Sequence, residues 1–383
     1  MIDSIEVSHA ASRRDLTAFI TFPWRVYRRD PLWVPPLISE RRETLDARRG
    51  QFFKQADVAL FTARRGRTVM GTIAAFVDRA RVERLKNAQG GFGFFEVVED
   101  YEAARLLLDA CRQWLRERGM RSVRGPTSFG ENDCPGVLVM GADYPPAMLE
   151  AHTPAYYKDF LERYGMVKDH DLYAWRVTFD QVRRELSGAS DIVHVADAAR
   201  GTGTVTIRTV RLDDWDREVE TIRFLFNDTL SHLPDAVPAG AEEFRRLADQ
   251  MRPFLDPELA LIAEVDGRAV GYCVMIPDTN QVLRRLNGRL FPFTWLSVRR
   301  WIREIDVISF KLAGVLTQYR RRGIDALLFS ESLARAMKRG YSWLDASLTS
   351  ELNPAVNLLA RARGAELYKH YRLYRMDVEG PAC

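Results

Sequence analysis

The chain has 383 residues, of which 46% are hydrophobic and 28% are charged, and its net charge is +4. This composition is typical of a globular protein and excludes an intrinsically disordered chain and a collagen-like fibre. The small net charge gives no indication of a chain-wide surface for nucleic acid. A chain of this length is expected to form two or three domains.

The four cysteines, Cys111, Cys134, Cys273 and Cys383, lie far apart in the sequence. No two of them have the spacing of metal ligands, and a disulfide framework would be sparse for this size. The N-terminal residues contain no apolar stretch of the signal-peptide kind, and no window of about 18 residues is continuously apolar. We therefore expect a cytoplasmic protein without a metal site.

Residues 1–55 are predicted to be irregular or helical. Within them, the segment 22–37 holds four prolines and two tryptophans. Because proline removes a backbone donor and clashes with the preceding helical turn, this segment cannot be one helix. We expect it to form an extended arm or a lid.

The next segments predict an α/β unit. Two strand-like runs, 57–65 and 68–77, flank Gly66 and indicate a β-hairpin, and a third strand is expected at 91–98. Apolar residues from Ala104 to Leu115 recur at helical spacing, and the helix is predicted to stop near Gly119. A short strand begins at Val123, and a loop follows over 125–136.

Small and polar residues over 183–203 indicate a linker, after which the pattern restarts. A strand at 205–210 and a helix at 213–228 precede a hairpin over 258–278, whose turn is Asp266-Gly267. Further elements are a strand at 307–316, a helix at 323–340, a strand at 342–348, a helix at 353–365 and a strand at 367–378. Since both halves show the same order of elements, the sequence predicts an internal duplication.

The run 315–328 is the most informative for function, because a strand leads through a basic turn with one glycine into a helix. Backbone N–H groups at such a helix start bind anions, assisted by the helix dipole. The three arginines at 320–322 would add charge-assisted hydrogen bonds, and a pyrophosphate fits this arrangement. The alternative is a solvated basic turn before an ordinary helix.

This run resembles motif A of the GNAT acyltransferase superfamily, whose pattern is Arg/Gln-x-x-Gly-x-Gly/Ala. Arg320 and Gly323 match the first two fixed positions, and Asp325 stands where Gly or Ala is usual. A second GNAT pattern is similar from Asn353 onward, but Ala360 replaces the tyrosine that often protonates the leaving thiolate.

Nearly the whole chain resembles a family of bacterial tandem-GNAT proteins, most of which are known as N-acyltransferases by inference. The resemblance implies two tandem GNAT-like α/β domains, each with a mixed, mostly antiparallel sheet flanked by helices. We divide the chain into an arm region (1–55), a degenerate first domain (56–182), a linker (183–203) and a second domain (204–383). The first domain is acidic over 98–108, where phosphate would sit, so we expect it to complete an acceptor site instead.

The resemblance implies that the second domain binds acetyl-CoA or a longer acyl-CoA as co-substrate. The residues it assigns to this ligand are Gly314, Val315, Leu316, Arg320, Arg321, Arg322, Gly323, Ile324, Asp325, Ala326 and Asn353. Backbone groups near 314–316 are also expected to stabilise the oxyanion.

Three side chains are candidates for proton transfer. Glu351, two residues before Asn353, is the first candidate base, and an exposed carboxylate at a strand end is its alternative reading. Glu96 follows an aromatic run and is expected to be partly buried with a raised pKa, unless it is a salt-bridged edge residue. Tyr371 is an acid candidate, although strand alternation predicts that Tyr371 and Tyr374 face opposite sides and that at least one packs in the core.

Residues 282–304 form an insert in which aromatic and leucine side chains alternate with arginines. This composition suits a membrane surface with anionic lipid, and less well nucleic acid. The alternative is that the insert is helical, packs on its own domain and binds neither lipid nor nucleic acid. Contact with the inner membrane surface is therefore an expectation, and nucleic-acid binding is not.

The predicted activity is acyl transfer from a thioester to an amine, with a small-molecule or lipid amine, such as a sphingoid base, as acceptor. One alternative is a Fem-like transferase that uses aminoacyl-tRNA, which predicts salt-sensitive tRNA binding. The other is a non-catalytic protein that binds coenzyme A or acts as a scaffold, which Asp325 and Ala360 favour.

Overall fold

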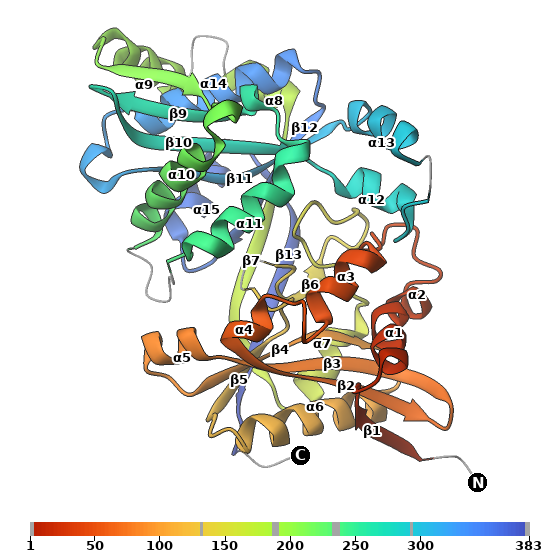
Figure 1. Cartoon of the computed structure of the whole chain (residues 1–383). Helices are drawn as coiled ribbons and strands as arrows, with labels where there is room; N and C mark the ends of the chain where they lie inside the picture. The colour runs from red at the N-terminus through yellow and green to blue at the C-terminus, as the bar shows by residue number, and fades with distance from the viewer. Residues whose placement is uncertain (1–3, 131–132, 186–190, 232–237, 292–293, 380–383) are drawn as a thin grey trace.

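The computed structural model describes residues 4–130, 133–185, 191–231, 238–291 and 294–379. The described strands form one sheet of 13 strands in the order β1-β2-β3-β4-β5-β13-β7-β12-β11-β10-β9-β8, and β6 also pairs with β13. Helices cover both faces of this sheet, which runs through two halves placed one above the other (Figure 1).

The first half contains the arm region and seven strands. Its elements are β1 (Ile5–His9), α1 (Arg13–Thr21), α2 (Pro23–Val26), α3 (Ile38–Leu45), α4 (Phe52–Gln55), β2 (Ala56–Arg65), β3 (Thr68–Asp78), α5 (Arg79–Leu85), β4 (Gln89–Val97), α6 (Tyr101–Arg116), β5 (Ser122–Gly125), β6 (Val137–Met140), α7 (Tyr156–Arg163) and β7 (Val167–Thr178).

The second half repeats the order of hairpin, strand, helix, strand, helix and strand. Its elements are α8 (Phe179–Glu185), α9 (Asp191–Gly201), β8 (Val205–Thr209), η1 (Leu212–Asp214), α10 (Trp215–Leu230), α11 (Ala241–Met251), η2 (Arg252–Phe254), η3 (Pro257–Leu259), β9 (Ala260–Val265), β10 (Arg268–Pro277), α12 (Asn280–Leu286), α13 (Thr294–Arg303), β11 (Val307–Val315), η4 (Thr317–Tyr319), α14 (Ile324–Lys338), β12 (Trp343–Ser350), α15 (Pro354–Ala362) and β13 (Glu366–Asp377).

Both predicted hairpins are confirmed, and their turns explain why. β2 and β3 pair antiparallel on either side of Gly66, which has φ +57°. In the second half, Asp266 and Gly267 have φ +50° and +74°, as a type I′ turn between β9 and β10 requires. The predicted amphipathic helix is α6, and Gly119 follows its end in the left-handed conformation.

The segment predicted as a linker is partly helical. Helix α9 packs against α14 through Ala196, Ala199 and Leu327. The small side chains that suggested a linker are what allow α9 to lie close to its neighbour. At the N-terminus, residues 5–9 form β1, which pairs with β2, so part of the predicted arm region is an edge strand of the sheet.

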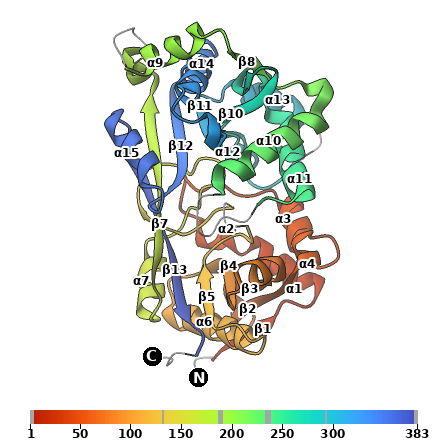
Figure 2. The same cartoon turned by 90° about the vertical axis from the view of Figure 1, so that its left-hand side faces the viewer.

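The two halves exchange their last strands. β7, the last strand of the first half, pairs with β12 of the second half. β13, the last strand of the chain, pairs with β5 of the first half and with β7. Figures 1 and 2 show both long strands passing between the halves. The domain limits at 56–182 and 204–383 stay a prediction, and the exchange joins the two halves across them.

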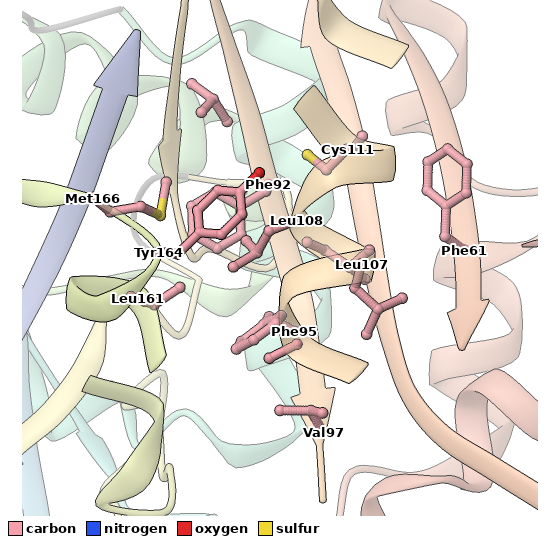
Figure 3. Packing of buried hydrophobic residues seen from close by; sticks show 14 of the residues in the cluster. Phe61, Phe92, Phe95, Val97, Leu107, Leu108, Cys111, Leu161, Tyr164 and Met166 are labelled. Carbon is pink, nitrogen blue, oxygen red and sulfur yellow. The ribbon is translucent and has the colours of Figure 1, made fainter. Parts of the chain in front are cut away.

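The core of the first half lies between α6 and the sheet. Leu107 of α6 is completely buried in a cluster with strand residues such as Phe92 and Val97 (Figure 3). Leu115 of the same helix is also completely buried in this cluster. Burial of a leucine side chain contributes about 1.5–3 kcal/mol, so this helix face holds the first half together. A second core joins β9, β10 and β11 to α14 through residues such as Ile262 and Leu328.

Candidate active site

Strands β11 and β12 diverge after a short parallel contact. They pair at Val307–Trp343, Ile308–Leu344 and Ser309–Asp345. Beyond these pairs β11 continues with β10, whereas β12 continues with β7. Lys311 is an extra residue at this point, because Phe310 lies opposite Met275 and Leu312 opposite Val274. Diverging strands turn backbone donors and acceptors toward the gap, where an extended ligand can pair with them.

A basic turn connects the far end of β11 to α14. Gly323 is the N-cap of α14 with φ +75°, and Arg321 before it has φ +61°. Arg320 folds back on the turn, since its guanidinium donates to the carbonyl oxygens of Val315 and Thr229, both at 3.2 Å. Arg321 and Arg322 are exposed beside the helix start. All three arginines are exposed, but Arg320 is hydrogen-bonded within the turn, which leaves Arg321 and Arg322 as the ones best placed to contact an anion.

The other residues that the sequence assigned to acyl-CoA differ in the groups that they leave available to a ligand. The amide of Leu316 donates to the carbonyl of Val270 at 2.8 Å, so the sheet uses this expected oxyanion donor. Gly314 lies close to Thr229, because a Cβ on Gly314 would be 2.5 Å from the Thr229 methyl carbon. Ile324 is 1% exposed and offers a ligand its backbone only.

Helix α9 borders the start of α14. A Cβ on Gly323 would lie 2.8 Å from the carbonyl oxygen of Val195, so only glycine fits under this helix. Ala326 also packs in the contact between α9 and α14. Asp325 is exposed in the first turn of α14, where a carboxylate is favoured by the helix dipole.

Glu351 and Asn353 lie at the end of β12, next to β7. The Glu351 carboxylate receives a hydrogen bond from Lys168 at 2.8 Å and one from the backbone N–H of Asp171 at 2.9 Å. Both of its oxygens are thus engaged by β7. Asn353 is the N-cap of α15, and its carbonyl accepts from the Asn357 side chain. Their expected roles stay predictions.

A buried polar cluster lies at the point where β11 and β12 diverge. We call it the seam cluster, because the first half contributes one of its residues. Its charged members are Glu150, Asp278, Lys311, Asp345 and Lys369, and its hydroxyl members are Ser309, Ser347, Tyr368 and Tyr371.

Asp345 is completely buried at the centre of the seam cluster. Its Oδ2 atom accepts hydrogen bonds from Ser309 at 2.9 Å and Ser347 at 2.7 Å, and it pairs with the Lys311 ammonium at 3.2 Å. Tyr368 donates to Oδ1 at 2.9 Å. A buried carboxylate needs partners of this kind, because its desolvation is otherwise costly.

Glu150 reaches the seam cluster from the loop between β6 and α7. It is 4% exposed, and its Oε2 atom accepts from the backbone N–H of Ala147 at 2.8 Å and from the Tyr371 phenol at 3.2 Å. Tyr368 donates to Oε1 at 3.2 Å. Burial, with the nearby charge of Asp345, raises the pKa of Glu150. The structure thus brings one sequence candidate, Tyr371, against a carboxylate that sequence reasoning missed.

Lys369 and Asp278 complete the seam cluster. Lys369 is completely buried, and burial lowers its pKa although the carboxylates of Glu150, Asp345 and Asp278 oppose this. Asp278 is 6% exposed, and burial raises its pKa to about 7. The available sequence signal was Lys311 and Asp345, each of which is the single charged residue of its strand, whereas Lys369 lies in a strand with several charged residues.

Glu96 lies in the first half, apart from the seam cluster. Its carboxylate accepts from the Tyr157 phenol at 2.7 Å, and burial raises its pKa to about 7. Tyr157 also donates to the Val97 carbonyl, so Tyr157 packs in the core. The raised pKa that the sequence predicted for Glu96 is present, and its role in proton transfer stays a prediction.

In the first half, β4 and β5 correspond to β11 and β12, and the loop after β5 fills the gap between them. The backbone N–H of Thr127, in the loop after β5, donates to the carbonyl of Phe92 on β4 at 3.0 Å. Phe129 stacks on Phe52 with ring centres 4.6 Å apart and contacts Phe94. At the start of α6, Asp100 caps the helix and pairs with Arg65. Aromatic rings and a carboxylate thus occupy the positions that a phosphate-bearing chain would need.

The arm (residues 22–37) spans both halves. Trp24 donates to the Asn287 side chain at 3.0 Å, in the insert of the second half. Asp30 contacts the His152 ring at 2.6 Å, and Tyr27 donates to the His152 carbonyl at 2.8 Å. His152 therefore contacts the arm, and the charge of Asp30 acts on Lys369. The arm therefore lies next to the seam cluster on the side of His152 and Lys369.

The predicted insert is two helices, α12 and α13. Val298, Trp301 and Ile302 of α13 pack on a small core with Val282 and Leu286. Leu290, Phe291 and Leu296 are more than half exposed. In the described ranges no helix is long and apolar enough to cross a membrane. Likewise, the described side chains include no group of three or more His, Cys, Asp or Glu placed to hold a metal ion.

Comparison with solved structures identifies the fold. The chain is similar to a tandem GNAT protein from the clavulanic acid biosynthesis pathway, with a TM-score of 0.57 and 12% identity over 99% of this chain and 100% of that one. It is also similar to a GCN5-related N-acetyltransferase from Sphaerobacter thermophilus, with a TM-score of 0.52 and 14% identity over 99% and 97% of the two chains. The predicted tandem GNAT fold is confirmed.

Two curated proteins match over nearly their full lengths. The bacterial ceramide synthase of Caulobacter vibrioides is 31% identical over 370 residues, 94% of each chain. Protein YghO of Escherichia coli is 31% identical over 376 residues, 96% of this chain and 94% of that one. No protein-family model matches. The chain therefore belongs to the family of these two proteins and is an acyltransferase with a tandem GNAT fold.

Proposed function

We propose that this protein transfers an acyl group from an acyl-CoA to the nitrogen of an amine. The observation that carries the proposal is the divergence of β11 and β12 between a basic turn and a buried cluster of titratable groups. Arg321, Arg322 and the start of α14 lie at one end of β11. The seam cluster lies at the other end, beside Ser309 and Asp345.

This arrangement suits a long thioester ligand. The stretch of β11 from Ser309 to Val315 spans about 20 Å at the usual rise per residue. The pantetheine arm of coenzyme A is an extended chain of comparable length. With its pyrophosphate on the turn, the thioester reaches the seam cluster, where carboxylates and phenols are available for proton transfer.

We further propose an amphiphilic or lipid amine as the acceptor. One 31% identical relative is named a bacterial ceramide synthase, which points to a long-chain amine. The exposed side chains of Leu290, Phe291 and Leu296 support the same acceptor, because they suit contact with a lipid surface from which such an amine would be taken. The protein then acts at a membrane surface as a peripheral enzyme.

Thermal melting of the full chain with coenzyme A, acetyl-CoA and a long-chain acyl-CoA tests the proposal. A ligand at about 100 times its Kd adds roughly 2.7 kcal/mol to the free energy of unfolding and raises the melting midpoint. We expect a rise in the wild type that is smaller in the double variant Arg321→Ser/Arg322→Ser. Arg217→Ser, which alters a side chain 80% exposed on α10, is the matched control and should respond like the wild type.

Release of free coenzyme A on addition of a long-chain primary amine is the second measurement. Turnover with an amine, and none without it, supports N-acyl transfer. If no acyl-CoA raises the midpoint, the proposal fails, and salt-dependent binding of aminoacyl-tRNA becomes the next measurement. A rise in the midpoint without turnover would identify a protein that binds coenzyme A without catalysis.

A further inference from the structure

The seam cluster carries more acidic than basic groups. Three carboxyl groups, Glu150, Asp278 and Asp345, face two ammonium groups, Lys311 and Lys369. Lys311 pairs with Asp345 at 3.2 Å. Among the described residues, neither Glu150 nor Asp278 pairs directly with an ammonium, although the charges of Lys311 and Lys369 act on them. Because an uncompensated charge is costly to bury, the ionised cluster is complementary to one further cation or proton.

Lys369 gives a second, independent indication that the cluster accommodates a ligand group. Its side chain is completely buried, yet its Nζ atom has no hydrogen-bond partner among the described residues. The charges of Glu150, Asp345 and Asp278 all act on it, so the ammonium lies among these carboxylates without bonding directly to one. Leaving a buried donor unpaired is costly, so an acceptor atom of a bound substrate would be stabilised beside Lys369.

The position of the cluster relative to β11 links it to the reaction. Ser309 and Asp345 form the last pair before β11 and β12 diverge, and their side chains are hydrogen-bonded to each other. A thioester chain laid along β11 from the basic turn ends at this pair. The attacking amine must therefore approach the seam cluster.

We propose that the seam cluster receives the amino group of the acceptor and takes its proton, with Glu150 as the base and Lys369 as the residue that keeps Glu150 ionised. This inference rests on the proposed function and assigns the first half a direct part in it. Glu150 belongs to the loop between β6 and α7, so the second half alone lacks the base. Lys369 acts as a positioning residue, because its ammonium is the charge that opposes protonation of Glu150 most strongly.

The chemistry balances as follows. The acceptor enters as an ammonium ion and gives one N–H proton to the Glu150 carboxylate, which releases it to solvent. The nitrogen lone pair forms the C–N bond to the thioester carbonyl carbon, and the C–S bond breaks with its electron pair leaving on the sulfur of coenzyme A. A second N–H proton leaves nitrogen and ends on that sulfur. The products are an amide, the coenzyme A thiol and one proton.

Glu150 is surrounded by charged and titratable groups from several elements, which makes its protonation adjustable. Those that act on it or contact it are Lys311 on β11, Asp345 on β12, Lys369, Tyr368 and Tyr371 on β13, Asp278 after β10, and Cys134 in the loop after β5. Removing a positive neighbour makes Glu150 harder to ionise, and removing a negative neighbour makes it easier.

The pH dependence of kcat/KM for the full chain tests the proposal, with a long-chain acyl-CoA and a long-chain primary amine as substrates. Glu150→Gln should lower kcat at least about 100-fold, as loss of a general base does. Lys369→Met should move the acidic limb of the profile to higher pH. Asp278→Asn should move it to lower pH by a smaller amount, because burial raises the pKa of Asp278 to about 7 and its charge is therefore present only over the upper part of the limb. Lys369→Arg, which keeps the charge, should leave the limb near its wild-type position.

Controls separate this inference from folding and from the proposed function. Lys158→Met, which removes an ammonium 37% exposed on α7, should change neither the rate nor the limb. Every variant should retain the rise in melting midpoint with acyl-CoA. Opposite shifts of Lys369→Met and Asp278→Asn support the proposal even where Glu150→Gln does not fold.

Two results would overturn the inference. One is a Glu150→Gln variant that folds, binds acyl-CoA and turns over at nearly the wild-type rate. The other is an acidic limb that stays in place in both Lys369→Met and Asp278→Asn. Either result leaves the wild-type acyl transfer standing. A wild type without acyl-CoA binding or turnover overturns the proposed function, and this inference with it.

Discussion

The phenol of Tyr371 donates a hydrogen bond to Oε2 of Glu150 at 3.2 Å, across 221 positions of the sequence. Tyr371 lies on β13, the strand that passes from the second half into the first half and pairs there with β5 and β6. Glu150 lies in a loop of the first half that contacts the second half through Asn280, which donates to the carbonyls of Pro146 and Ala147. The strand exchange therefore builds the seam cluster as well as joining the halves.

Replacing Tyr371 with phenylalanine tests whether this phenol serves the reaction. Tyr371→Phe removes one hydrogen bond to Glu150 and should reduce the free energy of unfolding by about 1 kcal/mol, with a clear fall in kcat. Tyr374→Phe is the matched control, because its phenol donates to Glu162 and its ring packs in the first core. Urea unfolding and coenzyme A release measure the two effects. Equal losses of kcat in both variants would contradict a role for Tyr371.

The stability of the protein should depend on pH through Asp278. Burial raises the pKa of Asp278 to about 7 in the folded protein, from an ordinary value of 3.8. The folded state then holds this proton more firmly than the unfolded state. The contribution of the bound proton to the free energy of unfolding is therefore fully present below pH 3.8 and is lost as the pH rises through 7. Asp278→Asn removes this dependence and should gain stability relative to the wild type between pH 4 and 8. Urea unfolding at a series of pH values measures it, and parallel curves would contradict the prediction.

The exposed apolar residues of the insert should bind lipid. The triple variant Leu290→Ser/Phe291→Ser/Leu296→Ser should sediment at least about tenfold less with vesicles that contain anionic lipid, since each lost side chain removes apolar area from the interface. Its melting midpoint should stay near the wild-type value, because these side chains are more than half exposed. Leu212→Ser, which alters an exposed leucine of η1, is the control. Unchanged sedimentation of the triple variant would show that the insert does not contact lipid.

The loop that fills the gap between β4 and β5 should need a glycine at position 93. A Cβ at this position would lie 1.5 Å from the Thr127 carbonyl oxygen, so Gly93→Ala must displace the loop that fills the gap between β4 and β5. Overpacking of this kind typically costs 1–3 kcal/mol, and contact with backbone places the variant at about 3 kcal/mol or above. Gly201→Ala, at a position with open space, is the control and should be nearly neutral. Equal stability of the two variants would disprove the close contact.

The sequence by itself determined the features that depend on local patterns. The turn at Asp266-Gly267 required positive φ at both positions, and the apolar spacing around Leu107 required a helix against a sheet. The motif at Arg320 and Gly323 was likewise readable, because a strand, a basic turn and a helix follow one another along the chain. These local signals predicted two α/β units, and the resemblance to GNAT proteins implied the tandem GNAT fold. Binding of an anion at the turn stays a prediction.

The tertiary structure alone decided which groups meet in the seam cluster. Glu150, Asp278, Asp345 and Lys369 come from four separate segments, and no spacing along the chain relates them. The fold also engages both oxygens of Glu351 with β7, although the sequence made Glu351 the first candidate base. Burial and charge pairing depend on which strands are exchanged and which loops cover them, and those are long-range contacts. The chain therefore encodes its fold locally, whereas its chemistry is set by packing between the halves.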